Sequence, residues 1–164
     1  MSVVGGIIMK KIFNVIIICM CLFFITGCGK EKEPEKTEFT MGDTISIKNF
    51  DITFVNYSLR APVSEKEEYN TLVFLEVNVK NTSKSGAKFK SSAYNVYGPN
   101  NLRLDKITSS KYESVVSNLG NIRADGTTTG HFVFPYIGTG EYYLEFINKN
   151  KKRITVEFTI YEEE

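Results

Sequence analysis

Hydrophobic residues recur at every second position along much of the chain after Asp43. This alternation is typical of β-strands that bury one face and expose the other. The most regular run, residues 72–79, places four aliphatic side chains on one face: Val73, Leu75, Val77 and Val79. At one end of the run, Leu72 and Phe74 make the opposite face apolar too, which predicts a strand that is central in its sheet or covered there.

Further strands are predicted at 45–57, around Phe89, and at 94–97, 102–107, 130–134, 142–146 and 154–160. In the first of these the alternation slips at Val55, as a β-bulge or a bend would produce. Polar turn sequences separate the strands at 81–83, 98–101, 123–126 and 148–151. Residues 113–117 carry a weak signal for either a short strand or a turn of helix. About eight short strands without an amphipathic helical pattern predict an all-β antiparallel sandwich, with a small closed barrel as the alternative.

The N-terminal region has a different pattern, in which an apolar stretch follows Lys10 and Lys11. A basic start and a short apolar segment are typical of a secretion signal. The apolar stretch is about 15 residues long, whereas a membrane-spanning helix needs roughly 20. An uncleaved membrane anchor is the alternative interpretation.

Residues 25–28, Ile-Thr-Gly-Cys, resemble the lipobox of bacterial lipoproteins, although that family usually has leucine in place of Ile25. The resemblance implies that a diacylglyceryl group is joined to the sulfur of Cys28 and that cleavage occurs between Gly27 and Cys28. Two acyl chains hold a protein stably in a membrane. We therefore expect a mature protein that is lipid-anchored at the cell membrane and faces outside the cytoplasm.

These signals divide the chain into a lipoprotein signal peptide at 1–27, a lipidated cysteine with a charged flexible linker at 28–40, and a β-sandwich domain at 41–161. The linker contains Pro34 and mixed charges without an apolar period, which is typical of a disordered tether. Translation from Met9 would make residues 1–8 a mis-assigned start. This second start is a hypothesis.

The charge balance argues against a nucleic-acid partner. The chain has 20 Lys and Arg against 19 Asp and Glu, and loss of Lys10 and Lys11 with the signal leaves 18 against 19, a net charge near −1. Nucleic-acid binding needs a clustered basic surface instead. Cys19 and Cys21 lie in the apolar stretch and would leave with it, so acylation of Cys28 leaves no free thiol or disulfide in the exported part.

Three segments of the predicted domain carry a further pattern: 77–83 (VNVKNTS), 124–135 (ADGTTTGHFVFP) and 142–146 (YYLEF). Together they resemble a family of bacterial lipoproteins with a telokin-like, immunoglobulin-like domain of unknown function. The resemblance spans roughly residues 41–160 and departs from the family at Ala124, where the family often has proline. It implies an immunoglobulin-like sandwich at the cell surface and no reaction.

Candidate catalytic and metal-binding residues are few. His131 is the only histidine, and its parity, opposite to that of Phe132, predicts a position facing solvent or the sandwich rim. Asp125 and Thr127 could complete a Thr–His–Asp set, but neighbouring residues of one strand do not easily adopt that geometry. A zinc site would need further His or Cys ligands. The aspartates near turns do not match the spacing of a calcium loop: Asp43, Asp51, Asp105 and Asp125. We expect no catalytic site, metal or cofactor.

Tyrosines are the stronger candidates for a binding surface. Tyr94 and Tyr97 differ in parity, as do Tyr142 and Tyr143, so one member of each pair must lie outside the core. Exposed aromatic clusters mark partner surfaces. We predict a candidate binding surface at Phe74, Tyr97 and Tyr143.

The favoured hypothesis is a membrane-anchored, non-enzymatic domain that binds a protein or cell-envelope partner outside the cytoplasm. An anchor, a flexible spacer and a rigid β-domain without a reactive cluster favour it. The alternative is a small-ligand or metal-binding lipoprotein, acting as a sensor or solute-binding protein. A third hypothesis is an envelope hydrolase that uses Asp125 or His131.

Lipidation of Cys28 can be tested by metabolic labelling. Labelled palmitate should enter the wild-type protein, and Cys28→Ala should abolish incorporation and leave an unprocessed precursor, because the lipid is joined to that sulfur. Cys21→Ala is the matched control and should be labelled like the wild type. Labelling of the Cys28→Ala protein, or a leader still attached to the mature protein, would contradict the prediction.

Overall fold

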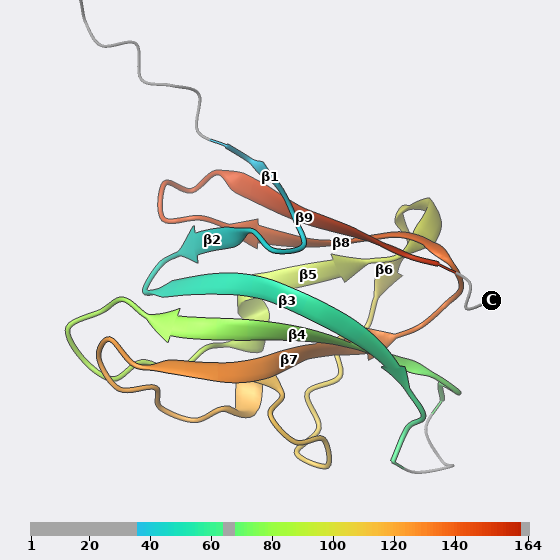
Figure 1. The fold of residues 1–164 in the computed structure, drawn as a ribbon, viewed down its shortest axis with the longest axis horizontal. Coiled ribbons are helices and arrows are strands. Elements are labelled where there is room, and N and C mark those ends of the chain that lie inside the picture. The colour runs from blue at the N-terminus through green and yellow to red at the C-terminus, as the bar shows by residue number, and fades with distance from the viewer. Residues whose placement is uncertain (1–35, 64–67, 162–164) are drawn as a thin grey trace, which may run out of the picture. The chain divides into compact units, whose positions relative to one another are not determined.

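The computed structural model describes residues 36–63 and 68–161, which form two stacked β-sheets (Figure 1). Sheet A has the strand order β1 (Glu38–Thr40), β9 (Arg153–Ile160), β8 (Gly140–Ile147), β5 (Tyr94–Tyr97) and β6 (Arg103–Leu104). Sheet B has the order β2 (Thr44–Ile47), β3 (Phe50–Arg60), β4 (Leu72–Asn81) and β7 (Thr127–Pro135). Three single-turn 3₁₀ helices lie in the connections: η1 (Ser91–Ala93), η2 (Pro99–Asn101) and η3 (Val116–Asn118).

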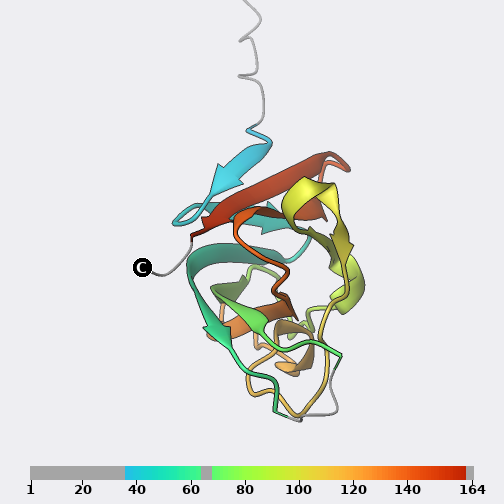
Figure 2. The ribbon, with the colours of Figure 1, turned by 90° about the vertical axis from the view of Figure 1, so that its right-hand side faces the viewer.

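The predicted sandwich is confirmed, and two separate sheets mean that the closed-barrel alternative is wrong. Figure 2 shows β9 in one layer and β3 in the other. Every pairing between the named strands is antiparallel except that of β1 with β9, which is parallel. Among the described residues there are nine strands against about eight expected: β1 was not predicted, the predicted run 45–57 forms two strands, β2 and β3, and no strand forms around Phe89.

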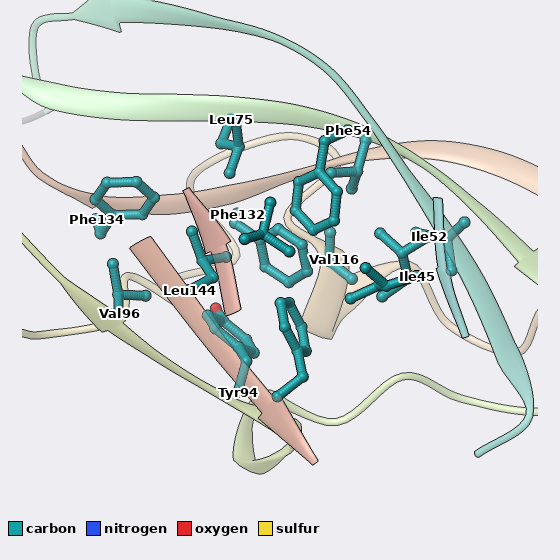
Figure 3. Packing of buried hydrophobic residues seen from close by; sticks show 14 of the residues in the cluster. Ile45, Ile52, Phe54, Leu75, Tyr94, Val96, Val116, Phe132, Phe134 and Leu144 are labelled. Carbon is teal, nitrogen blue, oxygen red and sulfur yellow. The ribbon is translucent and has the colours of Figure 1, made fainter. Parts of the chain in front are cut away.

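Phe132 of β7 lies at the centre of the core between the sheets (Figure 3). Its ring centroid lies 4.5 Å from that of Tyr94, 5.8 Å from Phe146, 5.9 Å from Phe89 and 6.2 Å from Phe54. Aromatic pairs at such distances stabilise a core beyond the burial of their area. The inward orientation of Phe132 predicted from its parity is confirmed.

The irregularity predicted near Val55 is a β-bulge. The register of β3 on β4 shifts between Phe54 and Asn56, and Val55 is left 44% exposed. Before the bulge, Ile52 and Phe54 face the core. Beyond it the parity is reversed, so the second half of β3 turns the opposite set of side chains outward.

Two predicted strands differ in the structure. No strand forms around Phe89, whose ring is buried where the chain crosses from sheet B to sheet A. β6 has two residues instead of extending over 102–107. The reason is that the chain leaves sheet A after Leu104 and reaches sheet B, where the Ile107 N–H donates to the Val133 carbonyl at 2.8 Å.

Residues 105–118, which we call the covering segment, lie along the outer edge of β7. The Ile107 N–H bonds to β7 as described, and the His131 N–H of β7 donates to the Ser114 carbonyl at 2.7 Å. An isolated parallel bridge joins Val115 to His131. The weak signal at 113–117 thus corresponds to one bridge followed by η3, and the edge of β7 has backbone partners there.

The covering segment also closes an apolar cluster on the outer face of sheet B, made of Leu72, Phe74, Tyr112, Val115 and Val133. Its next residue, Val116, belongs to the main core instead (Figure 3). A Cβ at Gly130 would lie 2.8 Å from Leu119 Cδ1 and 3.0 Å from the Ser114 carbonyl oxygen, so this glycine permits the close approach. The predicted covering of β4 is confirmed.

Asn81 joins the end of β4 to two loops. Its side chain is fully buried, and its Nδ2 donates to the carbonyls of Ser85, Ile122 and Arg123 at 2.7, 2.9 and 3.2 Å. Its Oδ1 accepts from the backbone N–H and the hydroxyl of Ser83 at 3.0 and 2.7 Å. The predicted turn at 81–83 is therefore built around one satisfied amide.

β1 begins at Glu38, inside the stretch expected to be a flexible linker, so the domain starts earlier than predicted. The Thr155 N–H of β9 donates to the Thr37 carbonyl at 2.8 Å, and Lys36 Nζ lies 2.9 Å from Asp43 Oδ2. Backbone pairing does not require apolar alternation, which explains why the sequence pattern missed this strand.

Residues 1–35 lie outside the described part of the chain, and with them the predicted signal peptide, the cleavage site and the lipidation of Cys28. Within the described residues, no helix has the length and hydrophobicity needed to span a membrane.

Replacing Asn81 should be costly for stability. Asn81→Ala leaves the buried Ile122 carbonyl, the part-buried bonds to the Ser85 and Arg123 carbonyls and the Ser83 N–H without this partner, so we expect a loss of roughly 2–4 kcal/mol in the free energy of unfolding, measured by urea denaturation. Asn78→Ala is the matched control on the same strand, because Asn78 forms one exposed bond with Thr129. It should lose about 0.5 kcal/mol. Equal losses would contradict the role given to Asn81.

Candidate functional site

A groove of about 420 Å³ opens on the outer face of sheet B, beside the covering segment. We call it the outer groove, and it is lined by Arg60, Ala61, Val63, Phe74, Lys111, Tyr112, Glu113, Ser114 and His131. Strands β3, β4 and β7 supply its floor, and the covering segment supplies one wall. It combines aromatic rings, two cations and the chain's histidine.

The bulge in β3 places Arg60 in this groove. Because the register shifts after Phe54, Ser58 pairs with Phe74 on β4, and Arg60 lies two residues further along the same face. Without the shift, Ser58 and Arg60 would have the parity of Phe54, which faces the core. The bulge thus moves a guanidinium from the inner to the outer face of sheet B.

Arg60 and Phe74 form a cation–π pair. The guanidinium carbon lies 4.6 Å from the ring centroid, and Arg60 Nε donates to Ser58 Oγ at 3.1 Å. The Phe74 ring also contacts Tyr112 edge-on, with 5.6 Å between the centroids. Phe74 is consequently only 5% exposed.

His131 packs against the same ring at 5.8 Å between centroids. Its Nδ1 is shielded from solvent and has no hydrogen-bond partner among the described residues. Burial, helped by the nearby charge of Arg60, lowers the pKa of His131 below its ordinary value, and Glu76 opposes this shift. The imidazole is therefore neutral at pH 7.

The charged side chains that line the groove are Arg60, Lys111 and Glu113. All three are exposed, and none of them forms an ion pair with another residue in 36–63 or 68–161. The lining therefore has an excess of positive charge next to two aromatic rings.

The three residues of the predicted binding surface do not come together. Phe74 lies on the outer face of sheet B, where Arg60 and Tyr112 cover it. Tyr97 and Tyr143 stack at 4.9 Å on the outer face of sheet A. They are half-buried, whereas Tyr94 and Tyr142 lie in the core, as the parity argument predicted.

Tyr97 and Tyr143 make contacts within the domain. Tyr143 Oη donates to Asn101 Oδ1 at 2.7 Å. Burial, followed by the charge of Glu145, raises the pKa of Tyr143. Because both rings are half-buried, the aromatic surface that they expose is smaller than the sequence indicated.

The proposed Thr–His–Asp set is not assembled. Thr127 and His131 lie on one extended strand, and four residues of strand separate them by about 13 Å. Asp125 precedes that strand, in the turn where the Gly126 N–H donates to the Arg123 carbonyl. In the part of the chain that the structure describes, no three His, Cys, Asp or Glu residues are grouped so that they could hold a metal ion.

No pattern in the sequence indicated the two cations of the groove. Arg60 follows the alternating part of β3, and Lys111 lies in a stretch without a period. Their positions depend on the bulge and on the path of the covering segment. The nearest available signal is that Arg60 lies two residues beyond Ser58, which pairs with Phe74. That signal can be recognised only when the register of β3 on β4 is already known.

Comparison with known proteins gives fold relatives only. No protein-family model and no curated protein matches the chain. Among solved structures, the candidate lipoprotein ycdA of Bacillus subtilis is 16% identical over 77% of this chain, with a TM-score of 0.55, and the chain spans 39% of that protein. MPT63, a secreted protein from Mycobacterium tuberculosis, is 9% identical, with 78% and 100% of the two chains covered and a TM-score of 0.56.

An uncharacterized β-sandwich protein from Clostridium difficile is 14% identical, with 79% and 99% of the two chains covered and a TM-score of 0.50. At these identities the similarity shows a shared β-sandwich fold. It supports the immunoglobulin-like architecture expected from the sequence.

The pKa of His131 can be measured from its ring C–H signals by NMR, because the chain has no other histidine. We expect a value below the ordinary 6.5 in the full-length protein in detergent micelles. Arg60→Gln should raise the pKa by removing a positive charge, and Glu76→Gln should lower it further. Lys80→Gln, at the exposed end of β4, is the control and should leave it unchanged.

The same shift predicts how stability depends on pH. Because the folded-state pKa of His131 is lowered, the unfolded chain binds the proton more readily. The contribution of His131 to stability is therefore fully present above the pKa of the unfolded state and is lost as the pH falls through the pKa of the folded state. A wild-type pKa at or above 6.5, or a value insensitive to both Arg60→Gln and Glu76→Gln, would contradict this electrostatic account.

Proposed function

We propose that this protein is a lipid-anchored, extracytoplasmic binding protein that contacts a protein or cell-envelope partner through the outer groove and catalyses no reaction. The observation that carries the proposal is that Arg60 and Lys111 are exposed beside Phe74 and Tyr112 and form no ion pair with another described residue. Arginine and aromatic side chains contribute strongly to binding at protein interfaces.

The location outside the cytoplasm is supported by two independent observations. Residues 25–28 resemble a lipobox with Cys28 as the acylated residue. The fold relatives include a candidate lipoprotein and a secreted protein, which is compatible with an exported domain. A rigid sandwich on a tether can reach a partner near the membrane without a fixed orientation.

A small-ligand sensor is the second candidate, because about 420 Å³ lies in the range of small-molecule pockets. Such pockets enclose most of their ligand. Here Arg60, Val63, Lys111 and Glu113 are all exposed around the opening. A small molecule would stay largely in water, whereas a partner protein would cover the rim, so we favour a macromolecular partner.

Site-specific photo-crosslinking in intact cells tests the proposal. A photoreactive amino acid at Glu113 in the full-length protein should give one discrete adduct, because that side chain lines the groove. The matched control places the same amino acid at Glu157, an exposed position on the outer face of sheet A, and should give no such adduct. Mass spectrometry identifies the crosslinked partner.

A blocking substitution makes the test specific for the groove. Ala61→Tyr fills part of the hollow and should remove the adduct, whereas Ser92→Tyr, at an exposed position beside β5, should leave it. Equal crosslinking from positions 113 and 157, or an adduct that survives Ala61→Tyr, would overturn the groove as the partner site.

A further inference from the structure

We propose that the outer groove binds the carboxylate of an aspartate or glutamate side chain carried by a peptide segment of the partner protein. The inference rests on the proposed function and adds the chemistry of the ligand. Two exposed cations, one planar and one a compact ammonium, converge on one hollow together with aromatic and aliphatic side chains. A single anionic group with apolar neighbours complements that lining.

Arg60 is oriented for this contact before a ligand arrives. Stacking on Phe74 at 4.6 Å and the bond from Nε to Ser58 Oγ at 3.1 Å restrain its side chain. The terminal N–H groups have no ion-pair partner in the described residues. A planar guanidinium binds a planar carboxylate through two parallel N–H···O bonds, and a restrained side chain loses less entropy when it does so.

The remaining charges favour a single carboxylate over a polyanion. Glu113 lines the groove, and Glu76 of β4 lies opposite His131 of β7 in the register of the two strands. A polymer of phosphates would bring further negative charges close to these carboxylates. A peptide can place one carboxylate at Arg60 and rest apolar side chains on Ala61 and Val63, both of which line the hollow.

The pKa of His131 should change when a charged group binds in the groove. The charged side chains around it are Arg60 on β3, Glu76 on β4, and Lys111 and Glu113 on the covering segment. A carboxylate bound at Arg60 adds a negative charge near the imidazole and stabilises its protonated form. Binding should therefore raise the pKa of His131, and by thermodynamic linkage the affinity should increase as the pH is lowered through that range.

The experiment uses NMR of His131 in the full-length protein in detergent micelles, with three probes. They are a blocked tripeptide with aspartate between two leucines, its asparagine counterpart, and inorganic phosphate. The aspartate peptide should shift the His131 signals with a Kd in the millimolar range and raise the pKa. The asparagine peptide should bind at least about tenfold more weakly, because it lacks the charge-assisted bonds.

Two variants assign the contact. Arg60→Gln should weaken binding of the aspartate peptide by about tenfold or more, with the dispersed NMR spectrum of the wild type showing that the domain remains folded. Arg153→Gln is the matched control, since Arg153 pairs with Glu145 on the outer face of sheet A, and should bind like the wild type.

Three results would overturn the carboxylate assignment: equal binding of the aspartate and asparagine peptides, no effect of Arg60→Gln, or tighter binding of phosphate than of the aspartate peptide. The crosslink from position 113 distinguishes a wrong carboxylate assignment from a wrong proposed function. An adduct that persists in Arg60→Gln without peptide binding refutes the carboxylate contact alone. Absence of the adduct in the wild type refutes the partner site itself.

Discussion

Backbone hydrogen bonds hold the covering segment along the edge of β7, and this contact shapes sheet B on both sides. Of two successive residues, Val115 packs on the outer apolar cluster and Val116 packs in the main core. The approach is close enough that β7 requires Gly130. Without the segment, Phe74 and its neighbours would form an exposed apolar patch beside an unpaired strand edge, a combination that favours aggregation. The outer groove is the part of this face that the segment leaves open.

Within the groove, one arginine has opposite effects on two neighbours. Arg60 covers Phe74 and so removes most of that ring from water, while its charge opposes protonation of His131. The result is a neutral imidazole, a buried ring and a guanidinium whose outer N–H groups form no ion pair with any other residue that the structure describes. Burial and charge act together here because the three side chains project from neighbouring strands on one face.

The parts of the fold that depend on local alternation could be predicted from the sequence. The 72–79 and 154–160 runs, the slip at Val55 and the bonds of Asn81 to Ser83 in the 81–83 turn all reflect chemistry within a few residues. The candidate site could not be predicted in the same way. Phe74 is covered by Tyr112, which is far along the chain, and Arg60 reaches it only because the bulge reverses the parity of β3. The candidate site could not be predicted because it depends on long-range contacts and on the register of β3, which the local sequence pattern does not contain.

The parallel pairing of β1 with β9 affects how the domain would respond to mechanical load. Tension transmitted to Lys36 along the axis of β1 would act on its hydrogen bonds to β9 simultaneously, in shear, because the two strands run in the same direction. Shear of several bonds at once resists rupture better than peeling them apart singly. A domain tethered through its N-terminal side would thus carry its strain at the rim of sheet A, away from the groove on sheet B.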